Sequence, residues 1–84
     1  MRDPRDLSVC NLLLEICQAI ARTPHELLIE TEWREEGASL TIHASRDDLT
    51  QIIGTYGITI EAIRALIRGI GMKSGRRYSV YVEQ

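Results

Sequence analysis

The stretch IIGTYGITI, residues 52–60, places two glycines three positions apart between aliphatic residues. The spacing alone is weak, because six glycines in a chain of 84 residues produce it by chance roughly 0.35 times. An aliphatic residue directly before the first glycine, Ile53, and another three positions after the second, Ile60, lower this expectation to roughly 0.026. Two interpretations remain open: a bend that joins two helices, and a loop that holds a phosphate group.

A helix is predicted on each side of this stretch. Ser45 to Asp48 reads as a capping-box start, and an apolar stripe of about two turns follows until Gly54 ends the helix. After Gly57, isoleucines at positions 60, 63, 67 and 70 follow helical spacing, while Arg64 and Arg68 lie on another face. This second helix is predicted to fade in GIGMKSG, residues 69–75, where glycines and a serine cluster.

The remaining segments predict one more helix and three strands. Asp3 and Pro4 begin a helix of about 19 residues, and a short turn follows at residues 23–26. Alternation in residues 27–33 and 39–44, around a turn at REEGA, predicts a β-hairpin, and alternation in RRYSVYVEQ predicts a final strand. The order α-β-β-α-α-β favours an α+β fold, in which three helices cover one face of a three-stranded mixed sheet. The last strand is expected beside the second and parallel to it.

The first predicted helix is unusually apolar. Its polar residues form only a narrow stripe, which consists of Ser8, Asn11, Glu15, Gln18 and Arg22. Either neighbouring elements cover both apolar sides of this helix, or part of its surface meets a second protein chain.

Charge divides the chain into two halves. Residues 1–48 carry five basic and ten acidic side chains, a net charge of −5, and residues 49–84 carry five basic and two acidic side chains, a net charge of +3. The basic half contains the glycine loop and so permits an anionic ligand there. Ordinary solvated faces explain the same charges, and Arg76 and Arg77 before the last strand fit either interpretation.

Several classes of protein are not expected. His25 and His43 have no nucleophile or carboxylate pattern that links them, so we predict neither an enzyme nor a cofactor. Cys10 and Cys17 would lie about 10 Å apart on one helix, which predicts reduced core thiols rather than a disulfide or a metal site. No apolar run approaches the roughly 20 residues that span a bilayer, and no secretory signal begins the chain. We expect a soluble cytoplasmic protein.

The motif IIGTYGITI, the following EAIRALI (residues 61–67) and the final strand together resemble the K-homology (KH) family in its type II arrangement. The resemblance covers nearly the whole chain. It is closest to the small single-KH proteins of bacteria, whose helix–strand opening matches TPHELLIETEW, residues 23–33. It implies one KH domain over residues 1–84 that binds single-stranded RNA, acts as an RNA chaperone or post-transcriptional regulator, and pairs with another KH-containing protein.

In KH modules the glycine loop clamps the backbone of about four nucleotides, while bases enter an apolar groove beside it. Gly54 and Gly57 permit close approach of the backbone, so that successive N–H groups can point toward a phosphate, and the next helix adds its positive dipole end. The groove is expected between the helix of residues 49–53 and the second strand. The candidate RNA-binding residues are Ile53, Gly54, Thr55, Tyr56, Gly57, Ile58, Arg64 and Arg68.

The loop departs from the family pattern in its charge. KH loops usually carry Lys or Arg between the glycines, whereas this chain has Thr55 and Tyr56. Each missing cation removes a phosphate contact and so lowers affinity and salt dependence. Thr55 can donate a hydrogen bond and Tyr56 can stack on a base. Arg64 and Arg68 either compensate or are surface residues, with Arg64 paired to Glu61.

A second function stays open beside RNA binding. The uncharged loop, the acidic first half and the apolar first helix favour a KH fold used for protein association, as a homodimer or as a heterodimer with another KH protein. RNA binding would then be weak or absent. The aromatic residues Trp33, Tyr78 and Tyr81 fall at β spacing, and we expect them to pack in or on the sheet.

Overall fold

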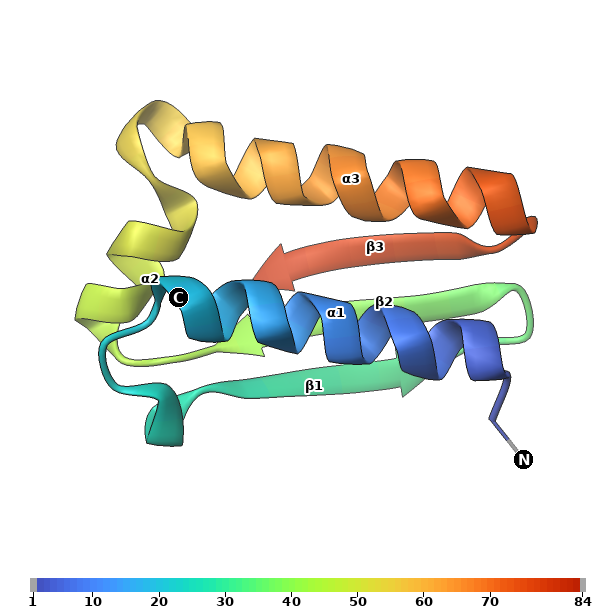
Figure 1. Cartoon of the computed structure of the whole chain (residues 1–84), viewed down its shortest axis with the longest axis horizontal. Helices are drawn as coiled ribbons and strands as arrows, with labels where there is room; N and C mark the ends of the chain where they lie inside the picture. Colours follow the sequence, from blue (N-terminus) through green and yellow to red (C-terminus); the bar gives the residue numbers. More distant parts are fainter. Residues whose placement is uncertain (1, 84) are drawn as a thin grey trace.

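In a computed structural model of the chain, which describes residues 2–83, three helices lie against one face of a three-stranded sheet (Figure 1). The elements in chain order are α1 (Pro4–Ile20), η1 (Pro24–Glu26), β1 (Leu28–Trp33), β2 (Gly37–His43), α2 (Arg46–Ile53), η2 (Thr55–Gly57), α3 (Ile58–Ser74) and β3 (Arg77–Val82), where η marks a short 3-10 turn. This confirms the predicted α+β fold and the order α-β-β-α-α-β.

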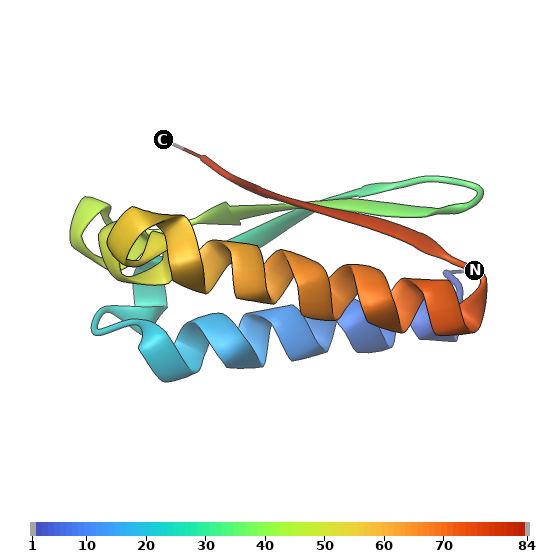
Figure 2. The same cartoon turned by 90° about the horizontal axis from the view of Figure 1, so that it is seen from above.

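The sheet is mixed, with β2 in the centre. β1 pairs antiparallel with β2, from Leu28 opposite His43 to Trp33 opposite Ala38, and β3 pairs parallel with β2. Figure 2 shows the two long helices α1 and α3 on the same side of the sheet. The other sheet face carries no helix of the described chain, and β1 and β3 are its edges.

Both predicted helix starts are confirmed by side-chain caps. Asp3 accepts a hydrogen bond of 2.8 Å from the backbone N–H of Arg5, and Pro4 is the first residue of α1. Ser45 accepts one of 3.2 Å from the backbone N–H of Asp48 at the start of α2.

α3 ends inside the predicted segment 69–75, at its last residues. The helix continues to Ser74 and ends at Gly75, whose φ of 71° is left-handed. Gly71 lies inside the helix because the chain folds back closely upon it: a Cβ there would lie 2.5 Å from the carbonyl oxygen of Arg76. This glycine therefore serves the packing of the helix on the following strand rather than helix termination.

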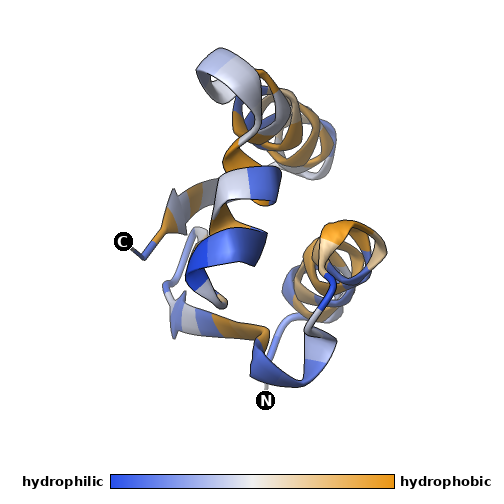
Figure 3. Ribbon diagram, turned by 90° about the vertical axis from the view of Figure 1, so that its left-hand side faces the viewer, coloured by the Kyte–Doolittle hydropathy of each residue, from blue (hydrophilic) through white to orange (hydrophobic). Residues whose placement is uncertain are grey.

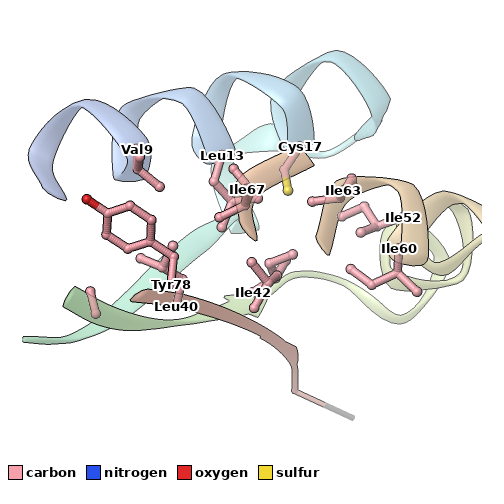
Figure 4. Packing of buried hydrophobic residues seen from close by; sticks show 12 residues of the cluster. Val9, Leu13, Cys17, Leu40, Ile42, Ile52, Ile60, Ile63, Ile67 and Tyr78 are labelled. Carbon is pink, nitrogen blue, oxygen red and sulfur yellow. The ribbon is translucent and has the colours of Figure 1, made fainter. Parts of the chain in front are cut away.

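One core lies between the helices and the sheet (Figure 4). Every helix contributes to it, β2 contributes most among the strands, and β1 adds only half-buried side chains. Its buried members are Val9, Leu13, Cys17, Ala38, Leu40, Ile42, Ile52, Ile60, Ile63, Ile67, Tyr78 and Val80. Both cysteines are free thiols, as predicted, and burial raises the pKa of Cys17 to about 11.

The two long helices differ in the surface that they turn away from the core. The outer face of α1 is mainly polar, through Ser8, Asn11, Glu15 and Gln18, with Leu7 and Ala19 also exposed. The outer face of α3 is uncharged until its last turn, where the exposed Lys73 lies, and it carries Ile58, Ala62, Ala65, Leu66, Gly69 and Met72. The sequence suggested an apolar surface on the first helix that a second chain could cover. In the structure α3 also has an apolar surface, and that surface faces away from the core more fully.

Candidate nucleic-acid interface

The first loop glycine is required by its backbone and by its neighbours. Gly54 ends α2 with φ 80° and ψ 171°, a region that is essentially restricted to glycine. A Cβ at this position would lie 2.3 Å from the Thr59 hydroxyl oxygen and 2.8 Å from the Thr59 Cβ. The chain can therefore turn closely against the first turn of α3.

The second glycine leaves the start of α3 open. Gly57 is the N-cap residue of α3 in the left-handed conformation, with φ 74° and ψ 15°. Among residues 2–83, a Cβ at Gly57 would meet no atom within 4 Å, and no side chain caps this end of the helix. An anion can thus approach the first turn of a 17-residue helix at its positive end.

The loop amides divide into two groups. The N–H of Gly57 donates to the carbonyl of Gly54 at 3.0 Å, and the N–H of Ile58 donates to the carbonyl of Thr55. The amides of Thr55 and Tyr56 donate to no acceptor within residues 2–83. These two amides remain available to a phosphate oxygen.

Tyr56 adopts a strained conformation without gaining burial. Its φ of 56° and ψ of 22° are left-handed, and it is the one non-glycine residue with positive φ among residues 2–83. Such a conformation typically costs about 1–3 kcal/mol. Because the side chain is 97% exposed, packing does not offset this cost. The turn instead presents an aromatic ring to solvent beside the loop amides.

A buried carboxylate fixes α2, and with it the loop. Asp48 accepts hydrogen bonds from the backbone N–H groups of Arg22, at 2.9 Å, and Thr23, at 3.0 Å, and from the Thr23 hydroxyl, at 2.6 Å. The hydroxyl hydrogen bond, followed by the two amide bonds, lowers the pKa of Asp48 to about 2. The capping-box sequence predicted the start of α2 but gave no sign of this long-range role.

Two hollows flank the loop and share Ile53. One has a volume of about 370 Å³ and is lined by the end of α2, the loop, α3 and β3, through Ile53, Tyr56, Gly57, Ile60, Glu61, Arg64, Tyr81 and Val82. The other is lined by Ala44, Arg46, Leu49, Thr50, Ile53 and Glu83, which belong to α2 and to the residues that directly follow β2 and β3. It lies beside the end of the second strand and not along it. Figure 3 views this end of the molecule, where the uncharged loop is drawn in pale colours.

Seven of the eight candidate residues lie at or beside this end, and Arg68 does not. Arg64 reaches the first hollow, where its Nε donates to the Val80 carbonyl at 3.0 Å and its Nη1 to Glu61 at 2.9 Å. The predicted Glu61 pairing is thus confirmed. Arg68 is exposed in a separate hollow further along α3.

Four residues that line the first hollow were not among the candidates, namely Ile60, Glu61, Tyr81 and Val82. Tyr81 was expected to pack on the sheet, yet it is 53% exposed and lines the first hollow. Its outward register in the last strand was visible in the alternation around Tyr78, but the proximity of that strand to the loop was not. Tyr78 is buried in the core, as expected.

Within residues 2–83, no group of three or more histidine, cysteine, aspartate or glutamate side chains is arranged to hold a metal ion. None of the helices in that range is both long enough and apolar enough to cross a bilayer.

Known proteins share this sequence pattern. The profile of the family described as KhpA/KhpB, KH domain, matches residues 11–82, which is most of the chain. The chain belongs to this KH-domain family. This confirms the resemblance that was based on the loop motif and on the order of elements.

Curated relatives agree with the family. A protein of Listeria monocytogenes is 26% identical over 66 residues, which are 79% of this chain and 87% of the relative. A protein of Mycobacterium tuberculosis is 29% identical over 63 residues, which are 75% of this chain and 79% of the relative. Both are named RNA-binding protein KhpA. The names describe binding proteins, which confirms the prediction that the chain is not an enzyme.

Proposed function

We propose that this chain binds single-stranded RNA at the Gly54–Gly57 loop. The observation that carries the proposal is an uncapped helix start, at Gly57, that opens beside two unpaired amides and a hollow with apolar side chains. The relatives named for RNA binding support the class of ligand. We propose that the chain is a single KH domain and that it acts in the cytoplasm as an RNA chaperone or post-transcriptional regulator.

The proposed mode of binding relies on the backbone more than on cations. A phosphate accepts hydrogen bonds from the amides of Thr55 and Tyr56 at the positive end of α3. A base stacks on the exposed ring of Tyr56, and its neighbour enters the first hollow against Ile53 and Ile60. Because Glu61 partly neutralises Arg64, we expect modest affinity and a shallow salt dependence.

Replacing Gly57 with aspartate tests the loop. We expect Gly57→Asp to weaken RNA binding at least about tenfold, since a negative charge then lies where the phosphate binds. The matched variant Gly57→Asn has nearly the same shape, tolerates the left-handed conformation and lacks the charge. Fluorescence anisotropy with short single-stranded RNA measures both variants, and circular dichroism checks that they are folded. Equal affinity of Gly57→Asp and the wild type would show that the loop is not the site.

The outer face of α3 favours a second function, association with another protein chain. Its exposed apolar side chains, which include Ile58, Leu66 and Met72, lie on one surface whose only charge within residues 2–83 is Lys73 in the last turn. The small residues Ala62 and Gly69 let a partner approach this helix closely. We propose a homodimer or a heterodimer with another KH protein as the alternative. The two functions are compatible, because a dimer presents two weak loops at high effective concentration.

A charge on the outer face of α3 tests association. We expect the wild type to sediment as a concentration-dependent dimer, and Ala62→Glu to sediment as a monomer because it buries a charge in the interface. Gln18→Glu, on the polar outer face of α1, is the matched control and should leave the dimer intact. Analytical ultracentrifugation measures all three proteins. A wild type that stays monomeric while binding RNA well would rule out association as the main function.

A further inference from the structure

A third hollow lies far from the loop, at the other end of the edge formed by α3 and β3. It is lined by Arg68, Met72, Arg76, Arg77, Tyr78 and Ser79. Arg76 is committed to the fold, because it donates to the buried Asp6 carboxylate and to the Glu35 carbonyl. Arg68 and Arg77 are exposed and make no side-chain hydrogen bond or ion pair within residues 2–83. Two unneutralised cations therefore face solvent there.

The first hollow, beside the loop, and this third hollow open along the same edge of the molecule. α3 leads away from the loop, so Arg68 lies about 16 Å along the helix from Gly57 at a rise of 1.5 Å per residue. β3 runs back in the opposite direction, from Arg77 to Val82, which lines the hollow beside the loop (Figure 1). A ligand longer than one hollow can thus continue from the loop to the arginines without crossing the core.

The chemistry along this edge changes from aromatic rings beside one cation at the loop to exposed cations at the far end. Tyr56 and Tyr81 lie at the loop end with Arg64, and Arg68 and Arg77 follow at the far end. Stacking faces combined with a cationic path are the features that bind single strands of nucleic acid without reading their sequence. Two carboxylates near the path are already paired, since Glu61 binds Arg64 and Asp6 binds Arg76. The exposed carboxylates of Glu35 and Glu36, beside Arg76 and Arg77, form no ion pair within residues 2–83, but they do not pair with Arg68 or Arg77 either.

We propose that a bound RNA strand continues along the α3–β3 edge, and that Arg68 and Arg77 hold phosphates beyond the nucleotides at the loop. This inference rests on the proposed function and extends it. The loop has no cation between its glycines, so these two arginines supply charge contacts that the loop does not. The site then binds a single strand of RNA that is longer than the roughly four nucleotides held by a KH loop and groove.

The double variant Arg68→Gln/Arg77→Gln tests the path with RNA probes of about four and about twelve nucleotides. We expect the variant to bind the long probe roughly two- to thirtyfold more weakly. The slope of log affinity against log salt should flatten by about 1.4, as two phosphate contacts are lost. The short probe should bind as it does to the wild type. In NMR titrations the short probe should shift the Gly57 amide, and the long probe should also shift that of Ser79.

Arg22→Gln/Lys73→Gln is the matched control, because it removes two exposed positive charges that lie off this edge. Equal binding of the long probe by the double variant and the wild type would overturn the path, as would equal weakening of both probes. Gly57→Asp separates the two proposals. If it weakens both probes while Arg68→Gln/Arg77→Gln changes neither, only the extension fails. If it changes neither probe, the proposed loop site fails, and the continuation from it fails too.

Discussion

Gly37→Ala is expected to lower the stability of the protein by about 3 kcal/mol or more, the upper part of the range for overpacked positions. Gly37 is buried at the start of β2, directly opposite Arg77 of β3. An alanine Cβ there would lie 1.7 Å from the Arg77 carbonyl oxygen and 2.6 Å from the carbonyl carbon. These are backbone atoms, so no side-chain rotation relieves the overlap. The parallel pairing of β2 with β3 must open at this end.

Thermal denaturation followed by circular dichroism measures the effect. A loss of about 3 kcal/mol corresponds to a fall in Tm of roughly 12–24 °C for a domain of this size. Gly69→Ala is the contrasting variant, because a Cβ there would meet no atom within 4 Å. It should raise stability by about 0.5–1 kcal/mol through helix propensity, when measured at low protein concentration. A Tm of Gly37→Ala within a few degrees of the wild type would contradict the close approach of β2 and β3.

Asp6→Asn is expected to cost about 3 kcal/mol, because it leaves a nearly buried guanidinium without its counter-charge. Asp6 is 3% exposed. It accepts hydrogen bonds from Arg76 Nε and Nη2, at 3.0 and 2.7 Å, and from the Tyr78 hydroxyl, at 2.7 Å. The Arg76 hydrogen bonds hold the pKa of Asp6 below its ordinary value. Asp47→Asn, which removes an exposed carboxylate from α2, is the control and should change little.

The pH dependence of the stability difference between the wild type and Asp6→Asn identifies the cause of that difference. A carboxylate whose pKa is lowered by folding contributes stability above its unfolded pKa, near 3.9, and loses that contribution as pH falls further. The gap between the wild type and Asp6→Asn should therefore be full at neutral pH and shrink below about pH 4. Urea denaturation at several pH values measures it. A gap that stays constant down to the acid limit would mean that the variant acts through packing rather than charge.

The elements of the fold could be predicted because their signals are local. Two-residue alternation identified the strands, three- and four-residue spacing identified the helices, and Asp3 and Ser45 marked two helix starts that the structure confirms. Gly37 was placed in a turn and Gly71 in a fading helix end. Both belong to regular elements, because the missing Cβ allows a close contact: of Gly37 with Arg77 across the sheet, and of Gly71 with the chain that folds back at Arg76.

The site was predicted at the loop and incompletely around it. The glycine spacing and the flanking isoleucines were enough to predict Gly54 and Gly57 as candidate binding residues without the structure. Tyr81 was not identified as part of the hollow beside the loop, because only the return of β3 along α3 brings it there. Asp6 and Asp48 look like ordinary acidic residues in first helical turns, yet both are buried and bind partners far along the chain. Local sequence does not encode such contacts.

The attachment of α2 through Asp48 bears on the entropy of binding. The clamp to Thr23 holds the start of α2, and the core isoleucines hold α3 on the other side of the loop. Both ends of the loop are therefore fixed before any ligand arrives, and the turn between them already has its own hydrogen bonds. An RNA strand that binds here loses freedom in its own backbone torsions, whereas the backbone torsions of the protein hardly change. The loss of conformational freedom on binding then falls on the ligand, and flexible sequences would bind less tightly than those already stacked in solution.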